Sequence, residues 1–115
     1  GVQTCALPIS LVRGVRRQRD RHVRSKTNQV KEWVLPTAWG QPYDAVADKN
    51  GEAWTGSMMS DRVSRLNPKT GDYVEYLLPK TTNIRRVFVD NTTTPVTFWT
   101  GSNHGASIVK VEPLD

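Results

Sequence analysis

The stretch KTNQVKEWVLPTAWGQPYDAVADKNGEAWTGSMMSDRVSRLNPKTGD, residues 26–72, holds short motifs that return later in the chain. EWVLP at residues 32–36 returns 43 residues later as EYLLP at 75–79. WTGS at residues 54–57 returns 45 residues later as WTGS at 99–102. Three weaker matches keep the same order: KT at 26–27 and 69–70, VAD and FVD at 46–48 and 88–90, and RVSRLNP and SIVKVEP at 62–68 and 107–113.

Each repeat reads as a set of short β-strands joined by tight turns. Asn50-Gly51 supplies the positive φ angles of a hairpin turn, and Pro68 and Gly71 mark a second turn. The predicted strands alternate polar with apolar residues or carry a large aromatic residue, and they occupy residues 43–48, 53–57, 62–67 and 73–78. A repeat of roughly 40–45 residues built this way is typical of a β-propeller blade. The predicted fold class is all-β, with about two four-stranded antiparallel blades and almost no helix.

The repeat region is smaller than a closed propeller, which usually has about four to eight blades. Residues 26–115 provide two blades, the second without its outer strand, and a lone strand near residues 30–35. We therefore interpret residues 26–115 as the C-terminal blades of a longer propeller.

The net charge of +5 invites a nucleic-acid or membrane partner, but its distribution argues against both. Residues 1–25 contain six arginines and one acidic residue, Asp20, whereas residues 26–115 contain ten basic and ten acidic side chains. The whole excess lies outside the repeat. We expect no nucleic-acid partner, and no apolar run approaches the length of a membrane span.

Residues 1–25 also look foreign to the repeat. Residues 1–10, GVQTCALPIS, resemble a translated sequencing-adapter tail at the end of a metagenomic reading frame. One choice of codons for residues 18–25, read one base later, encodes a segment that aligns without a gap on residues 61–68. We interpret residues 1–25 as a non-native or disordered basic tail that arose from a sequencing artefact and a frameshift. The alternative is a natural disordered basic arm.

Cys5, in this tail, is the only cysteine, so the repeat region cannot contain disulfides, cysteine-bound zinc or a cysteine nucleophile. No targeting segment is readable. A propeller without cysteine suits an oxidising compartment, and we expect the full-length parent to be periplasmic or secreted and monomeric.

Four motifs, in order, resemble the virginiamycin B lyase (streptogramin lyase) family. They are EWVLP at 32–36, PYDAVAD at 42–48, GEAWT at 51–55 and RVSRLNPKTG at 62–71. The resemblance covers nearly all of residues 26–115 and implies a seven-bladed β-propeller. It also implies an enzyme that linearises cyclic streptogramin B antibiotics by elimination at an ester. In the family, a magnesium ion held by acidic residues acts as a Lewis acid and a histidine transfers the proton.

The resemblance assigns a catalytic role to one residue of this chain. The family's key glutamate ends the WTG strand and its histidine follows two positions later, which correspond here to Ser102 and His104. The earlier repeat has Ser57 and Met59 at these positions. His104 therefore matches, but a serine hydroxyl is a poor substitute for a carboxylate on magnesium. Magnesium is expected by resemblance only, and these residues predict no metal ligand in this chain.

The residues themselves suggest further ligand-binding candidates. Ser102, Asn103 and His104 form a polar segment after a strand, where propellers place groups that face ligands. Arg85 and Arg86 begin an inner strand and could bind an anion in the central channel.

Tyr43 begins the preceding inner strand and is a further candidate ligand contact, and Trp39 could line the channel mouth. Other residues are read as structural: Trp33, Trp54 and Trp99 as packing between blades, and Asp48 and Asp90 as turn caps. The plain alternative for His104 is an exposed loop histidine hydrogen-bonded to backbone, and the alternative for Arg85 and Arg86 is a solvated or salt-bridged pair.

Three functions follow from these observations. The first is a streptogramin-type lyase, a magnesium-dependent carbon–oxygen lyase. The second is a non-catalytic extracytoplasmic propeller that binds a small-molecule ligand or a protein partner, because this fold hosts many functions. The third is a sensor or scaffold module fused to other domains.

Overall fold

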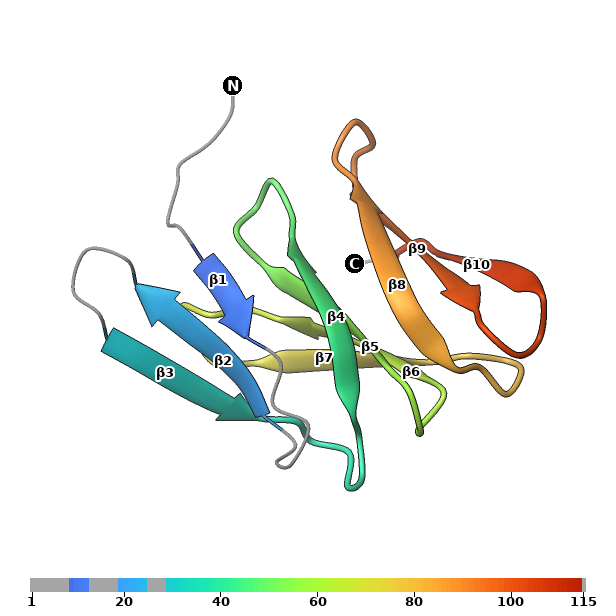
Figure 1. The fold of residues 1–115 in the computed structure, drawn as a ribbon. Helices are drawn as coiled ribbons and strands as arrows, with labels where there is room; N and C mark the ends of the chain where they lie inside the picture. The colour runs from blue at the N-terminus through green and yellow to red at the C-terminus, as the bar shows by residue number, and fades with distance from the viewer. Residues whose placement is uncertain (1–8, 13–18, 25–28, 115) are drawn as a thin grey trace.

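The described part of the chain contains only β-strands and their connections. The computed structural model describes residues 9–12, 19–24 and 29–114 (Figure 1). Its strands form three antiparallel sheets. The first sheet contains β1 (Ile9–Val12), β2 (Arg19–Arg24) and β3 (Gln29–Val34). The second contains β4 (Pro42–Ala47), β5 (Ala53–Ser57), β6 (Arg62–Leu66) and β7 (Tyr73–Leu77). The third contains β8 (Ile84–Asp90), β9 (Thr97–Ser102) and β10 (Ser107–Val111).

The second and third sheets confirm the predicted blades. The second sheet has the strand order β4-β5-β6-β7, in which each strand pairs with the next one in the chain. The third sheet has the order β10-β9-β8 and contains no fourth strand among the described residues. The three sheets stand side by side in a row in Figure 1. The all-β propeller fold predicted from the repeat is therefore confirmed.

The strand predicted near residues 30–35 is β3, but it is not alone. It pairs with β2, and the pair Arg19↔Val34 has the same register as Arg62↔Leu77 on β6 and β7, 43 residues later. β1 and β2 thus lie within the segment interpreted as a foreign tail. Residues 1–8, 13–18 and 25 of that segment lie outside the described residues, and its origin stays a prediction.

Trp54 connects the second sheet to the third. Its side chain is completely buried, and its ring stacks on Tyr76 of its own sheet at 5.8 Å and on Phe98 of β9 at 5.3 Å. The guanidinium carbon of Arg65 lies 5.5 Å from the Trp54 ring centroid and adds a cation–π contact. The predicted role of Trp54 in packing between blades is therefore seen directly.

The other two recurring tryptophans differ in their surroundings. Trp33 on β3 is buried and belongs to a cluster with Ala53, Leu66 and Tyr73 of the second sheet, so it joins the first two sheets. Trp99 has the strand position of Trp54, and its ring lies 5.5 Å from the Lys110 ammonium. It is only half-buried, because no described sheet follows the third one.

Asp48 fixes both a turn and the central tryptophan. Its Oδ1 accepts hydrogen bonds from the backbone N–H groups of Asn50 at 2.8 Å and Glu52 at 3.0 Å. Its Oδ2 accepts the indole N–H of Trp54 at 2.8 Å. The predicted turn cap is present, and the bond to Trp54 is an additional role that the turn pattern does not reveal.

Gly56 allows the second and third sheets to approach closely. A Cβ atom at this position would lie 2.2 Å from Cγ2 of Ile84, closer than real Cβ contacts. Gly101, the equivalent residue on β9, would place a Cβ in open space. The same repeat position is therefore packed in one sheet and uncovered in the next.

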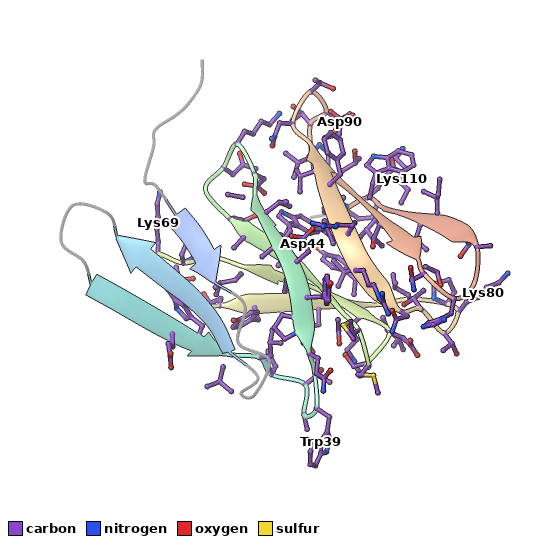
Figure 2. All side chains as sticks on the ribbon, in the orientation of Figure 1. Trp39, Asp44, Lys69, Lys80, Asp90 and Lys110 are labelled. Atoms are coloured by element: carbon purple, nitrogen blue, oxygen red, sulfur yellow. The ribbon has the colours of Figure 1, made fainter. Side chains whose placement is uncertain are left out.

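Replacing Trp54 by Ala should lower the free energy of unfolding by about 3–5 kcal/mol, because a large buried aromatic would leave a cavity. Urea unfolding followed by circular dichroism measures the change. Trp39→Ala is the matched control: Trp39 is 83% exposed (Figure 2), and its loss should change the free energy by less than about 0.5 kcal/mol. Equal effects of the two changes would contradict the central role of Trp54.

Asp90 should titrate below its ordinary range. Its carboxylate accepts hydrogen bonds from the Thr92 hydroxyl at 2.6 Å and the Thr92 backbone N–H at 2.9 Å, and both lower the pKa of Asp90. The hydrogen-bonded Asp90 carboxylate contributes its full stabilisation of the fold above the unfolded-state pKa of roughly 3.9. This stabilisation is lost as pH falls through the lower folded-state pKa. Thr92→Ala should raise the pKa of Asp90, as measured by carboxyl NMR titration. An unchanged pKa would assign the shift to other groups.

Candidate functional site

Four loops lie at one end of the sheets and are hydrogen-bonded in a row. They follow β3, β5, β7 and β9 and span residues 35–41, 58–61, 78–83 and 103–106 (Figure 1). The Met58 N–H donates to the Gln41 carbonyl at 3.0 Å, and the Asn83 side-chain amide donates to the Met58 carbonyl at 3.3 Å. The Asn103 N–H donates to the Asn83 carbonyl at 3.0 Å. We call this surface the loop face.

Asn83 is the residue that joins most of these elements. Besides its contacts to Met58 and Asn103, its Oδ1 accepts a hydrogen bond from Nε of Arg85 at 3.2 Å. The loop that contains Asn83, residues 78–83, is also held by Asp61, whose Oδ1 accepts the Thr82 N–H at 2.7 Å. Sequence reasoning missed Asn83. The only signal was an amide residue directly before an inner strand, which also occurs in ordinary loops.

Arg85 and Arg86 lie at an irregularity in the inner strand β8. The register of β8 against β9 shifts between Ile84 and Val87, so the two arginines occupy a bulge. Both are exposed, and the Arg86 side chain is 89% exposed. Their predicted position on the inner strand is correct, and their binding role stays a prediction.

The preceding sheet has the same irregularity. β4 shifts its register between Pro42 and Asp44, which places Tyr43 in the bulge. Asp44 Oδ2 accepts the Val87 N–H at 3.3 Å and lies 4.0 Å from Nη1 of Arg86. Sequence reasoning missed Asp44, which lies at the centre of the row of sheets in Figure 2. Its contact to the next sheet depends on packing between blades, which no local motif reports.

Ser57 and Ser102 end equivalent strands and use their hydroxyls in the same way. Ser57 Oγ accepts the backbone N–H groups of Met59 at 3.3 Å and Ser60 at 3.2 Å. Ser102 Oγ accepts the Gly105 N–H at 3.1 Å, and both serines are buried. The observed role of Ser102 is therefore to hold the loop that carries Asn103 and His104. Its predicted contact with a ligand stays a prediction.

Asn103 and His104 occupy this loop between β9 and β10, and both side chains are exposed. The loop returns to β10 through Ala106, which has a positive φ of 47°. Asn103 and Arg85 are thus linked through Asn83, which accepts a hydrogen bond from each of them. It shows no described contact that assigns His104 a chemical role.

The described residues do not fit a magnesium site. They contain no group of three or more His, Cys, Asp or Glu side chains placed to hold a metal ion. At the two strand ends where the resemblance expects metal-binding carboxylates, Ser57 and Ser102 each accept N–H groups of their own loops. The described residues therefore provide no ligand set through which a magnesium ion could act.

The part of the chain that the structure describes contains no helix that is long and apolar enough to cross a membrane.

Removing the Ser57 hydroxyl should loosen the loop face. Ser57→Ala leaves partly buried N–H donors of Met59 and Ser60 without their acceptor, at a cost of about 1–3 kcal/mol. Hydrogen exchange at these two amides should accelerate accordingly. Ser107→Ala, an exposed control on β10, should leave both exchange rates unchanged. Unchanged exchange in Ser57→Ala would show that the hydroxyl does not hold the loop.

The geometry is similar to that of known lyases. No protein-family model and no curated protein sequence matches the chain. Among solved structures, virginiamycin B lyase from Staphylococcus aureus superimposes with a TM-score of 0.66 at 20% identity, over 84% of this chain and 35% of the lyase. A catalytically inactive histidine-to-alanine variant of that lyase with quinupristin superimposes equally well.

A second lyase gives the same result. A streptogramin B lyase structure superimposes with a TM-score of 0.67 at 16% identity, over 88% of this chain and 36% of that protein. The chain therefore spans about a third of the length of these enzymes. At these identities the likeness concerns the fold, and it confirms the predicted resemblance at that level: the chain has the β-propeller blade fold of the virginiamycin B and streptogramin B lyases.

Proposed function

We propose that the loop face binds a small anionic ligand, with Arg85 as its main contact. The observation that carries this proposal is a pair of exposed guanidinium groups, Arg85 and Arg86, on a bulged inner strand beside the row of loops. Guanidinium groups bind carboxylate and phosphate through paired, charge-assisted hydrogen bonds. A bulge beside a site commonly redirects side chains in this way.

The two arginines differ in how well they are positioned. Nε of Arg85 donates to Asn83, which orients its guanidinium relative to the loops and leaves the terminal nitrogens for a ligand. Arg86 lies 4.0 Å from Asp44, and an exposed ion pair at this distance contributes little. We therefore assign binding mainly to Arg85, with Arg86 adding positive charge and Asn103 a polar contact.

Streptogramin-type elimination is a second candidate, favoured by the lyase fold and by the exposed position of His104 after β9. In that reaction His104 would transfer the proton, since histidine titrates near neutrality. The described residues do not supply the magnesium ligands of such an enzyme. The lyase proposal therefore requires carboxylates from outside the described part of the chain.

Phosphate and citrate are suitable probes of the anion site. Titration of the 115-residue chain with either anion, followed by amide NMR, should shift signals at residues 83–86 and 103–105. Arg85→Gln should weaken binding about 10-fold or more, because a hydrogen bond to a charged group contributes about 1.5–3 kcal/mol.

The matched control is Lys69→Gln, which removes the same charge from a loop at the other end of the second sheet (Figure 2). It should leave the affinity unchanged. An equal loss in both variants would show nonspecific attraction by net charge, and the proposed site would then be wrong.

The lyase proposal has its own test, which is linearisation of quinupristin by the full-length propeller, with and without magnesium. His104→Ala should reduce turnover roughly 10²–10⁴-fold with binding largely kept, as expected for loss of a general acid–base group. Absence of turnover in the unchanged protein would exclude this substrate and favour the binding module. Magnesium-dependent turnover that survives the substitution would place the proton transfer on another residue.

A further inference from the structure

The inner strands β4 and β8 carry opposite charges at the same position of the repeat. Asp44 and Arg86 are equivalent by strand register, because each directly precedes the residue that pairs with the threonine of the neighbouring strand, Thr55 or Thr100. The Thr55 hydroxyl donates to the Asp44 carbonyl at 2.8 Å, and the Thr100 hydroxyl donates to the Arg86 carbonyl at 3.1 Å. The two backbones are therefore held in the same way, and the side chains differ.

The residues beside this position show what the packing of a blade keeps constant between repeats. The neighbouring strand reads WTG in both blades, at residues 54–56 and 99–101. The position of Asp44 and Arg86 changes instead from an anion to a cation. Packing of the blade therefore does not dictate the residue at this position, which leaves it open to a role at the surface.

The two side chains meet across the boundary between the second and third sheets, where β4 lies next to β8 (Figure 2). Asp44 Oδ2 lies 4.0 Å from Nη1 of Arg86. This separation is longer than the roughly 2.7–3.2 Å of an N–H···O hydrogen bond. The Arg86 side chain is 89% exposed and the Asp44 side chain is 29% exposed. Both charges are thus accessible to a charged ligand, and an exposed pair of this kind contributes little to stability.

The Asp44 carboxylate has a fixed orientation and can accept further donors. Its Oδ1 accepts the Ala45 N–H at 3.1 Å, and its Oδ2 accepts the Val87 N–H at 3.3 Å. A carboxylate offers about four acceptor positions, so these two bonds orient the group and leave capacity for a donor from a ligand.

We propose that this site binds an α-amino acid, with the ligand's carboxylate on Arg85 and Arg86 and its ammonium group on Asp44. The two charged groups of an α-amino acid are attached to the same carbon, so their spacing is comparable to the 4.0 Å between Asp44 and Arg86. Each end of the ligand then meets the opposite charge: the ammonium group is a donor and the carboxylate an acceptor. The inference rests on the proposed anion site and states which class of anion that site selects.

Glutamate and glutarate test the inference because they differ only in the amino group. Each is titrated into the 115-residue chain and followed by amide NMR at residues 43–45 and 83–87. Glutamate should bind about 10-fold more tightly, the size of effect expected for a hydrogen bond to a charged group. Glutarate carries one more net negative charge at neutral pH, so nonspecific attraction by the arginines would give the opposite order.

The outcomes separate this inference from the proposed function. Glutarate that binds as tightly as glutamate, or more tightly, would overturn the amino-acid site and leave the anion site in place. If neither compound shifts the signals of residues 83–86, the anion site itself is wrong and the inference falls with it.

Asp44→Asn removes the charge and keeps the shape of the side chain. It should weaken glutamate binding about 10-fold and leave glutarate at least as tightly bound, which also shows that the variant is folded. Asp72→Asn is the matched control, because Asp72 is exposed in the turn between β6 and β7 that also contains Lys69. It should keep the preference for glutamate. A preference that survives Asp44→Asn would overturn the role of Asp44.

N-Acetylglutamate gives an equivalent test in the unchanged protein. The acetyl group removes the positive charge of the amino group, so this compound should bind no more tightly than glutarate. Binding equal to that of glutamate would show that the ammonium group is not recognised, and the proposal would then be wrong.

Discussion

The buried indole of Trp54 is the contact on which the packing of the second sheet against the third depends. Its ring is stacked between Tyr76 and Phe98, and its N–H is held by Asp48. A buried indole requires both apolar contact and a hydrogen-bond acceptor, and Asp48 provides the acceptor while it closes the adjoining turn. Turn, strand and packing between blades are therefore coupled through one side chain.

The loop face depends indirectly on the packing of the second sheet against the third. Because the second and third sheets approach closely at Gly56, Asn83 reaches Met58 in one direction and Asn103 in the other. The strand-end serines then hold their own loops by accepting backbone N–H groups, as short polar side chains do in turns. Ser102 is thus occupied in supporting the loop that carries His104, whereas the side chains of Arg85, Arg86 and Asn103 are exposed on the loop face.

The lyase fold and the composition of the loop face point to different functions, and the difference has a physical basis. A blade is maintained by recurring aromatic, glycine and turn residues, which serve packing whatever the protein does. The resemblance to the lyases also implies metal-binding carboxylates at strand ends, where the two described blades have the hydroxyl groups of Ser57 and Ser102. An arginine oriented by Asn83 is suited to binding an anion, and this binding requires no further group from another blade.

The sequence by itself determined the blades, because repeat spacing and two-residue alternation are local properties that also set strand register. The 43-residue offset between EWVLP and EYLLP reappears in the pairing of β2 with β3 and of β6 with β7. Tertiary structure alone decided the site and the exposure of equivalent residues. The contacts of Asn83 and Asp44 join loops and strands of different blades, so no single motif contains them. Val63 and Ile108 occupy the same repeat position, yet one is buried and the other is exposed, because burial depends on whether a neighbouring sheet is present.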